Sequence, residues 1–330
     1  MTRSIGRARR MLTLLQCKAF SLLEKINLFK DNMIMKKFFL ISIFLFSQLA
    51  FATQELTLYF IPSPHGIDWS TPSTLAQTAV KNKFSFKSHF MGHVWVEIKC
   101  GGTHELTGMT DYNPDYFYQL LIERRGLGVL FHSFNGQMEK KADIQKEMPE
   151  LFKQGRINFI TFKINQSQCE RAAQYVSEYR KFNVGRFYGL ANRPRYGEGS
   201  GCSAFGASFV DVLNFIDQDI KDSWSHSINI PLELAGPPLT DEKVSLFKLL
   251  FNARSWAKED EKHQKLFFWD PDKMYHWVKR KISEKNNGFT IKKVDLSEGV
   301  IVDKSNFPTP VGPIWLQRLN PKNGKETLNL

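Results

Sequence analysis

The sequence predicts an α+β fold, in which a small sheet packs against helices. Alternating apolar and polar residues predict strands at 55–61, 93–99, 103–110 and 157–164. Apolar residues at helical spacing then predict helices at 165–182 and 202–216. This order of strands, helix, loop and helix is typical of an α+β core.

The first half of the chain is read mostly as strands. Glu55–Ile61 ends at a Pro-Ser-Pro sequence. His93–Lys99 and Thr103–Thr110 are separated by a cysteine and two glycines, which predicts a hairpin. Pro114–Arg124 has helical spacing, and Gly126–Phe134 is read as a strand with aromatic ends.

The second half begins with a predicted helix that opens at Asn165 and runs to about Phe182. A loop rich in Gly, Arg and Tyr follows at Gly185–Gly201, and it leads into the apolar helix Cys202–Ile216. We therefore expect residues 53–224 to form the core of the protein.

The character of the sequence changes after Trp224. Lys243–Trp256 and Pro271–Ser283 have amphipathic helical spacing, and Phe289–Ile301 is read as a late pair of strands. Because no flexible linker precedes this region, we expect residues 225–330 to be a mainly helical extension that wraps the core.

The N-terminus has the pattern of a secretory signal peptide. Residues 35–52 contain two lysines, an apolar run at 38–49 and the sequence Ala-Phe-Ala. The run is short for a membrane span, which needs about 20 apolar residues. Residues 1–34 are read as an upstream start assigned too early or as an extended n-region. We therefore expect a secreted protein, periplasmic or extracellular in a bacterial envelope.

Charge and motifs exclude several classes of function. The full chain has a net charge of +12, but residues 53–330 carry 36 basic and 31 acidic residues, a balance of +5. No block of Lys and Arg suggests a nucleic-acid partner. The sequence contains no metal-binding or nucleotide-binding motif, so no cofactor and no metal are expected.

Three cysteines follow the expected signal peptide: Cys100, Cys169 and Cys202. Export makes disulfides possible, and an odd count leaves one thiol over. A Cys100–Cys169 pair would leave Cys202 free. Sequence alone gives no geometry, so this pairing stays open at this point.

Cys202 and His93 are the candidate catalytic residues. Cys202 follows the turn Gly199-Ser200-Gly201 and begins a predicted helix, whose N-terminus favours a thiolate and offers backbone N–H groups to an oxyanion. His93 begins a strand and is the candidate general base. Ser203 is a candidate for the oxyanion or substrate site.

A third polar group is expected to orient the imidazole. His104 and Glu105 both lie on the strand across the hairpin from His93. A two-residue turn would place His104 on the same face as His93, whereas a bulge would select Glu105. Both remain candidates.

These motifs resemble the circularly permuted branch of the papain-like NlpC superfamily, which includes lecithin:retinol acyltransferase-like proteins. The matching stretches are Gly92–Val96, His104-Glu105, Tyr188-Gly189-Leu190 and Cys202–Phe205. The resemblance covers about 55–216. It implies an antiparallel sheet packed by the cysteine helix, acyl chemistry through a thioester, and a place for Tyr188 near the substrate.

Two functions of different classes follow. The first is a secreted thiol hydrolase or acyltransferase, with a cell-wall peptide amide as the favoured substrate and a lipid ester or N-acyl lipid next. The second is a catalytically idle envelope protein that binds glycan, lipid or protein in the same cleft or through its tail. Peripheral association with the envelope is compatible with either.

Overall fold

The structure is a computed structural model that describes residues 54–85, 88–112, 118–284 and 288–317. The expected signal peptide at 35–52 lies outside these residues. These described residues belong to one compact unit. Across the described ranges, no helix is long and apolar enough to cross a membrane.

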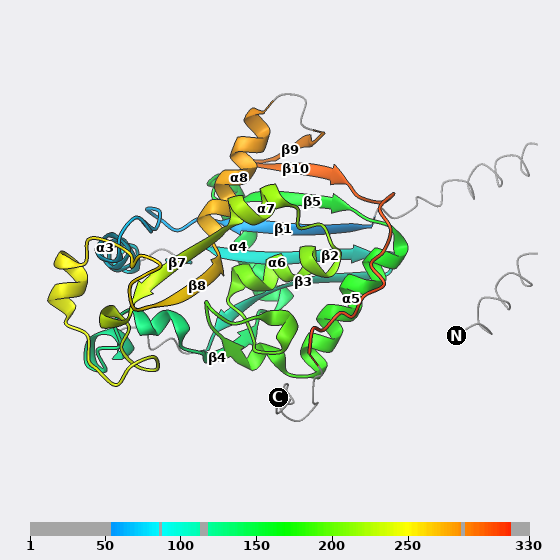
Figure 1. The fold of residues 1–330 in the computed structure, drawn as a ribbon. Helices are drawn as coiled ribbons and strands as arrows, with labels where there is room; N and C mark the ends of the chain where they lie inside the picture. Colours follow the sequence, from blue (N-terminus) through cyan, green and yellow to red (C-terminus); the bar gives the residue numbers. More distant parts are fainter. Residues whose placement is uncertain (1–53, 86–87, 113–117, 285–287, 318–330) are drawn as a thin grey trace, which may run out of the picture. The chain divides into compact units, whose positions relative to one another are not determined.

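A mixed sheet of eight strands organises this unit (Figure 1). Its strand order is β6-β4-β3-β2-β1-β5-β10-β9, and each neighbouring pair is antiparallel except β5 and β10, which are parallel. The strands are β1 (Glu55–Ile61), β2 (His93–Cys100), β3 (Thr103–Asp111), β4 (Phe134–Met138), β5 (Asn158–Lys163), β6 (Phe187–Tyr188), β9 (Thr290–Val294) and β10 (Ser297–Asp303).

Helices cover both faces of the sheet, because its central strands are apolar on both sides. Alternate residues of β1 and β2, including Leu58 and Val96, pack against four helices, whereas Trp95 packs against the single helix α4 on the other face. The helices on the first face are α5 (Gln166–Lys181), α6 (Cys202–Val212), α7 (Gln218–Trp224) and α8 (Pro271–Ser283); α4 spans Lys141–Lys153.

A second apolar core lies beside the sheet. It is formed by α3 (Pro72–Lys83), by short helices and by a two-stranded sheet, with Leu75, Leu249 and Phe268 among its buried residues. The two strands are β7 (Ser225–Pro231) and β8 (His263–Trp269). The short helices of this core are η1 (Tyr118–Ile122), η2 (Leu127–Phe131), η5 (Leu232–Leu234) and η6 (Lys248–Asn252). Two further short helices, η3 (Val184–Arg186) and η4 (Pro194–Tyr196), pack beside the main sheet and α6.

The α+β class is confirmed, and several predicted elements match closely. The predicted strand Glu55–Ile61 and the predicted helix Pro271–Ser283 have these same bounds in the structure. Asn165 begins α5: its side chain accepts a hydrogen bond from the N–H of Gln168, and the side-chain oxygen of Gln168 accepts one from the N–H of Asn165.

Other expectations were wrong. Gly126–Phe134 is not a strand, because Gly126 has a φ of 53° and leads into η2. Lys243–Trp256 contains only the short helix η6. The tail after residue 224 is not mainly helical, since it contributes β7, β8, β9 and β10 together with α8. The first residues of the predicted helix Pro114–Arg124 lie outside the described residues, and η1 follows them.

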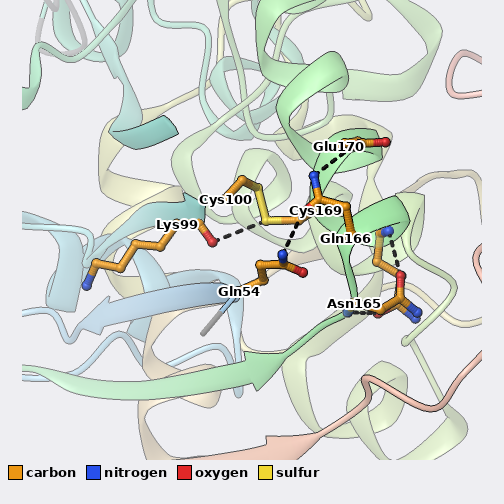
Figure 2. The surroundings of a disulfide bond; sticks show 8 residues. Gln54, Lys99, Cys100, Asn165, Gln166, Cys169 and Glu170 are labelled. Atoms are coloured by element: carbon orange, nitrogen blue, oxygen red, sulfur yellow. Dashed lines mark hydrogen bonds between the residues drawn. A yellow bond between two sulfur atoms is a disulfide. The ribbon is translucent and has the colours of Figure 1, made fainter. Parts of the chain in front are cut away.

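A disulfide between Cys100 and Cys169 joins the end of β2 to α5, with the two Cα atoms 5.7 Å apart (Figure 2). Close by, the Gln54 amide donates to the side chain of Gln166, which in turn donates to Glu170. Cys202 is the free cysteine among the described residues, and it is buried. The pairing left open by the sequence is thereby resolved.

Candidate active site

Cys202 is the first residue of α6, as the sequence predicts. Gly201 is the N-cap and forms no side-chain cap, so the first-turn N–H groups have no partner from a capping side chain. The preceding residue is fixed in place, because the Ser200 N–H donates to the carbonyl of Phe187 at 3.2 Å and its hydroxyl hydrogen-bonds Tyr179 at 2.9 Å. The start of the helix is therefore firmly positioned.

A glycine lets α6 lie close to β2. A Cβ atom added to Gly206 would come within 2.5 Å of the Cγ1 of Val94, closer than such contacts occur. Val94 directly follows His93 in the chain. The absence of a side chain at Gly206 thus helps to bring the cysteine helix and the histidine strand together.

His93 is the first residue of β2 and is buried. The Cys202 side chain lies close enough to the imidazole to favour its charged form, and Nε2 of His93 lies 2.7 Å from Oε2 of Glu139. Burial opposes the charged imidazolium, but the charge of Glu139 and the interactions with Cys202 outweigh it and raise the pKa of His93 well above its ordinary value. The structure therefore joins thiol, imidazole and carboxylate in one chain of contacts.

Glu139 occupies the place expected for the third group. It directly follows β4, and its second oxygen accepts a hydrogen bond from Nε1 of Trp95 at 3.2 Å. Burial alone would raise the pKa of this carboxyl group, but His93 and Trp95 outweigh it, and the pKa is lowered. Gly108 leaves the space that the carboxylate fills, since a Cβ atom there would overlap Oε2 of Glu139.

The two residues proposed as the third group lie elsewhere. His104 is on the same face as His93, as a two-residue turn predicts, but it pairs with Lys99 at the far end of the hairpin. Six residues of strand separate these positions, which corresponds to about 20 Å. His104 hydrogen-bonds Glu97 at 2.6 Å. Neither it nor Glu105 contacts the imidazole of His93.

Glu105 points to the opposite face of the sheet, because adjacent residues of a strand alternate in direction. There it forms an ion pair with Arg180 of α5, at 2.8 Å. The sequence had no signal for Glu139, which is distant along the chain from both candidate residues. Only the pairing of β4 with β3 brings it to the site.

A second histidine stacks on the first. The rings of His89 and His93 lie 4.4 Å apart with an angle of 21° between their planes. Nε2 of His89 lies 3.1 Å from Oε1 of Glu147 in α4. Burial and the neighbouring His93 lower the pKa of His89, while its hydrogen bond to Glu147 acts in the opposite direction. The hydrogen bond from His89 lowers the pKa of Glu147 to about 2.

Cys202 is one of the residues that line an apolar pocket of about 210 Å³. Ser203 and Tyr188, both predicted to lie near the substrate, are among its lining residues. The Ser203 hydroxyl donates a hydrogen bond to the carbonyl of Trp269 at 2.6 Å, which holds the Ser203 side chain against the wall of the pocket. Most of the other lining residues are aliphatic or aromatic, and the charged ones are Lys83 and Asp270.

Among the described residues, no group of three or more His, Cys, Asp and Glu side chains is arranged to hold a metal ion. Comparisons with protein-family models, with curated proteins and with solved structures found no match. The function must therefore be argued from the geometry of the site itself.

Proposed function

We propose that the protein is a cysteine-dependent hydrolase or acyltransferase with a papain-like catalytic arrangement, in which Cys202, His93 and Glu139 act together. The observation that carries this proposal is the chain of contacts from the thiol through the imidazole to a buried carboxylate. Such a chain activates a sulfur nucleophile and orients its acid–base partner. The uncapped start of α6 adds N–H groups suited to an oxyanion.

In the proposed reaction His93 takes the proton of the Cys202 thiol, and the resulting thiolate attacks the carbonyl carbon of an ester or amide. The C–S bond forms, the bond to the leaving oxygen or nitrogen breaks, and His93 gives its proton to that leaving atom. Water or an acceptor hydroxyl or amine then attacks the thioester. His93 takes the proton of this second nucleophile, and the sulfur leaves.

The pocket favours an apolar acyl group as the substrate. Cell-wall peptides carry several charged groups, whereas this pocket is lined mostly by side chains such as Leu127, Leu249 and Phe268. Burial of hydrocarbon in such a site is favourable by about 25 cal/mol per Å². A lipid ester or N-acyl lipid therefore fits better than the peptide amide that the sequence alone favours.

The decisive experiment combines thiol labelling with acyl-enzyme trapping. The protein starting at Thr53 is mixed with p-nitrophenyl esters of short and long fatty acids, and its mass is measured after quenching in acid. We expect one hydroxylamine-sensitive acyl group on Cys202, formed faster with the long chain, and none in Cys202→Ala. Loss of turnover in His93→Ala, with the fold retained by circular dichroism, would identify the acid–base partner.

A Cys202 that resists both acylation and iodoacetamide until the protein is denatured would overturn this proposal. The protein would then be the catalytically idle alternative, and the same pocket would be examined as a binding site. Faster acylation by acetyl than by long-chain esters would leave the chemistry intact but remove the preference for lipids.

A further inference from the structure

Large exposed apolar side chains gather on short elements that also line the apolar pocket. Leu249 of η6 lines the pocket, and Phe247 and Phe251 on either side of it are 66% and 57% exposed. Leu120 of η1 lines it too, and in the same short helix Ile122 is 61% exposed. Each of these elements is therefore apolar on its pocket side and on its solvent side.

The third element of this group is α3. Val80 and Lys83 in its last turn line the pocket, and Phe84, its C-cap, is exposed. Figure 1 shows α3 on the same side of the molecule as the yellow helical segment that contains η6. The structure also packs α3 directly against η6, since the Ser73 hydroxyl donates to the carbonyl of Leu249 at 2.8 Å.

These exposed residues form what we call the entrance rim, defined as Phe84, Tyr118, Ile122, Phe247 and Phe251. Aromatic and aliphatic side chains exposed beside one another mark an interaction surface more often than isolated exposed residues do. The rings of Phe247 and Phe251 contact each other, with centroids 5.3 Å apart. They form a continuous apolar surface rather than two separate exposed residues.

We propose that the entrance rim docks on a lipid bilayer, so that an acyl chain passes from the membrane into the pocket without crossing water. This inference rests on the proposed function, because it supplies the apolar substrate of the same site. A bilayer is favoured over a protein partner because the rim continues inward as the lining of a pocket, through Leu120 and Leu249. A protein surface docked there would close the entrance.

The charges beside the rim are compatible with a membrane surface. Basic residues lie next to each of its elements in the sequence, where they can reach lipid headgroups while the apolar side chains enter the acyl region. They are Lys81, Lys83, Arg124, Arg125, Lys243, Lys248 and Arg254. The acidic residues of the same segments are Glu123, Asp241 and Glu242, and Lys248 forms an ion pair with Glu233. The surface is thus basic on balance.

The test measures vesicle binding without any catalysis. Cys202→Ala protein starting at Thr53, which contains the whole compact unit, is sedimented with vesicles of phosphatidylethanolamine and phosphatidylglycerol. The variant adds Phe247→Ser and Phe251→Ser, and the matched control adds Leu296→Ser and Val311→Ser, which are also exposed but lie outside the entrance rim. Thermal melting by circular dichroism checks that each protein is folded.

We expect the rim variant to bind vesicles at least roughly tenfold more weakly than its parent, because two phenyl rings no longer enter the bilayer. The control should bind as the parent does. Equal binding by the rim variant and its parent would overturn the proposal. A stable dimer that the rim substitutions dissociate would overturn it too, since a second copy would then cover the surface. Because the thiol is absent throughout, failure of the proposed chemistry would not affect this result.

Discussion

The imidazole of His93 lies between two groups that stabilise its charged form, the sulfur of Cys202 and the carboxylate of Glu139. Two further rings flank it, that of His89 stacked at 4.4 Å and that of Trp95 in edge contact at 5.7 Å. In such a setting a charged ring requires both partners, since burial alone would keep it neutral. Removal of either partner is therefore expected to change the protonation of the ring.

Glu139→Gln is the sharpest test of the third residue. The amide keeps the size of the side chain but removes the charge, so the pKa of His93 should fall and its orientation should weaken. We expect kcat/KM for a long-chain ester to drop by roughly 10²–10⁴-fold. His104→Gln and Glu105→Gln serve as controls and should stay near the parent, because neither side chain reaches the imidazole.

The loss of stability in Glu139→Gln should also depend on pH. The lowered pKa of Glu139 contributes stability above about pH 4.5, and this is lost as the pH falls through its folded value. The raised pKa of His93 contributes stability below about pH 6.5, and this is lost as the pH rises through its folded value. The difference in urea midpoint between parent and Glu139→Gln should thus be largest near pH 5–6 and shrink at both ends. A difference that did not vary with pH would contradict the ion pair.

At the scale of elements, the contact between α6 and β2 decides whether thiol and imidazole meet. Gly206→Ala should destabilise the protein by about 1–3 kcal/mol, because the new methyl group overlaps Val94. The better helix propensity of alanine offsets part of this cost, by up to about 1 kcal/mol. Val94→Ala in the same protein removes the overlapping atom and should recover part of the loss. Additive effects in urea unfolding would show that the two positions do not interact.

Elements with a strong local signal were predictable from sequence. The alternation at Glu55–Ile61, the cap at Asn165 and the apolar face of Pro271–Ser283 gave elements that the structure confirms. Lys243–Trp256 was not predictable in this way, because its Phe residues face solvent and only Leu249 is buried in the short helix η6. Its apolar pattern reflects the pocket entrance rather than the packing of a long helix.

The candidate site likewise contains residues that were predictable from sequence and one that was not. Cys202 and His93 stand at an element start marked by neighbouring glycines, and the structure brings their side chains together. Glu139 follows the short strand β4, whose sequence Phe-Asn-Gly-Gln-Met has little strand character. The position of Glu139 depends on the pairing of β4 with β3 and on the missing side chain at Gly108. Neither can be read from the local sequence.

At the scale of the whole molecule, the disulfide fixes α5 to the central hairpin. Cys100 and Cys169 are separated by 69 residues, and closing a loop of that length in the unfolded chain is worth about 4 kcal/mol in the loop-entropy description. We expect the double variant Cys100→Ala/Cys169→Ala to lose stability of this order in urea unfolding. Thiol titration of the denatured, unreduced protein starting at Thr53 should find one free thiol, and three would contradict the bond.

The parallel pairing of β10 with β5 joins segments that are far apart in the chain, with Glu298 opposite Asn158. Val300 of β10 is fully buried in the main core. Until this strand is in place, β5 has an unpaired edge available to other chains. A nascent chain therefore cannot complete its sheet until residue 303 has emerged, even though Cys202 and His93 emerged long before. The sheet that carries His93 is thus completed by a strand that follows both His93 and Cys202 in the chain.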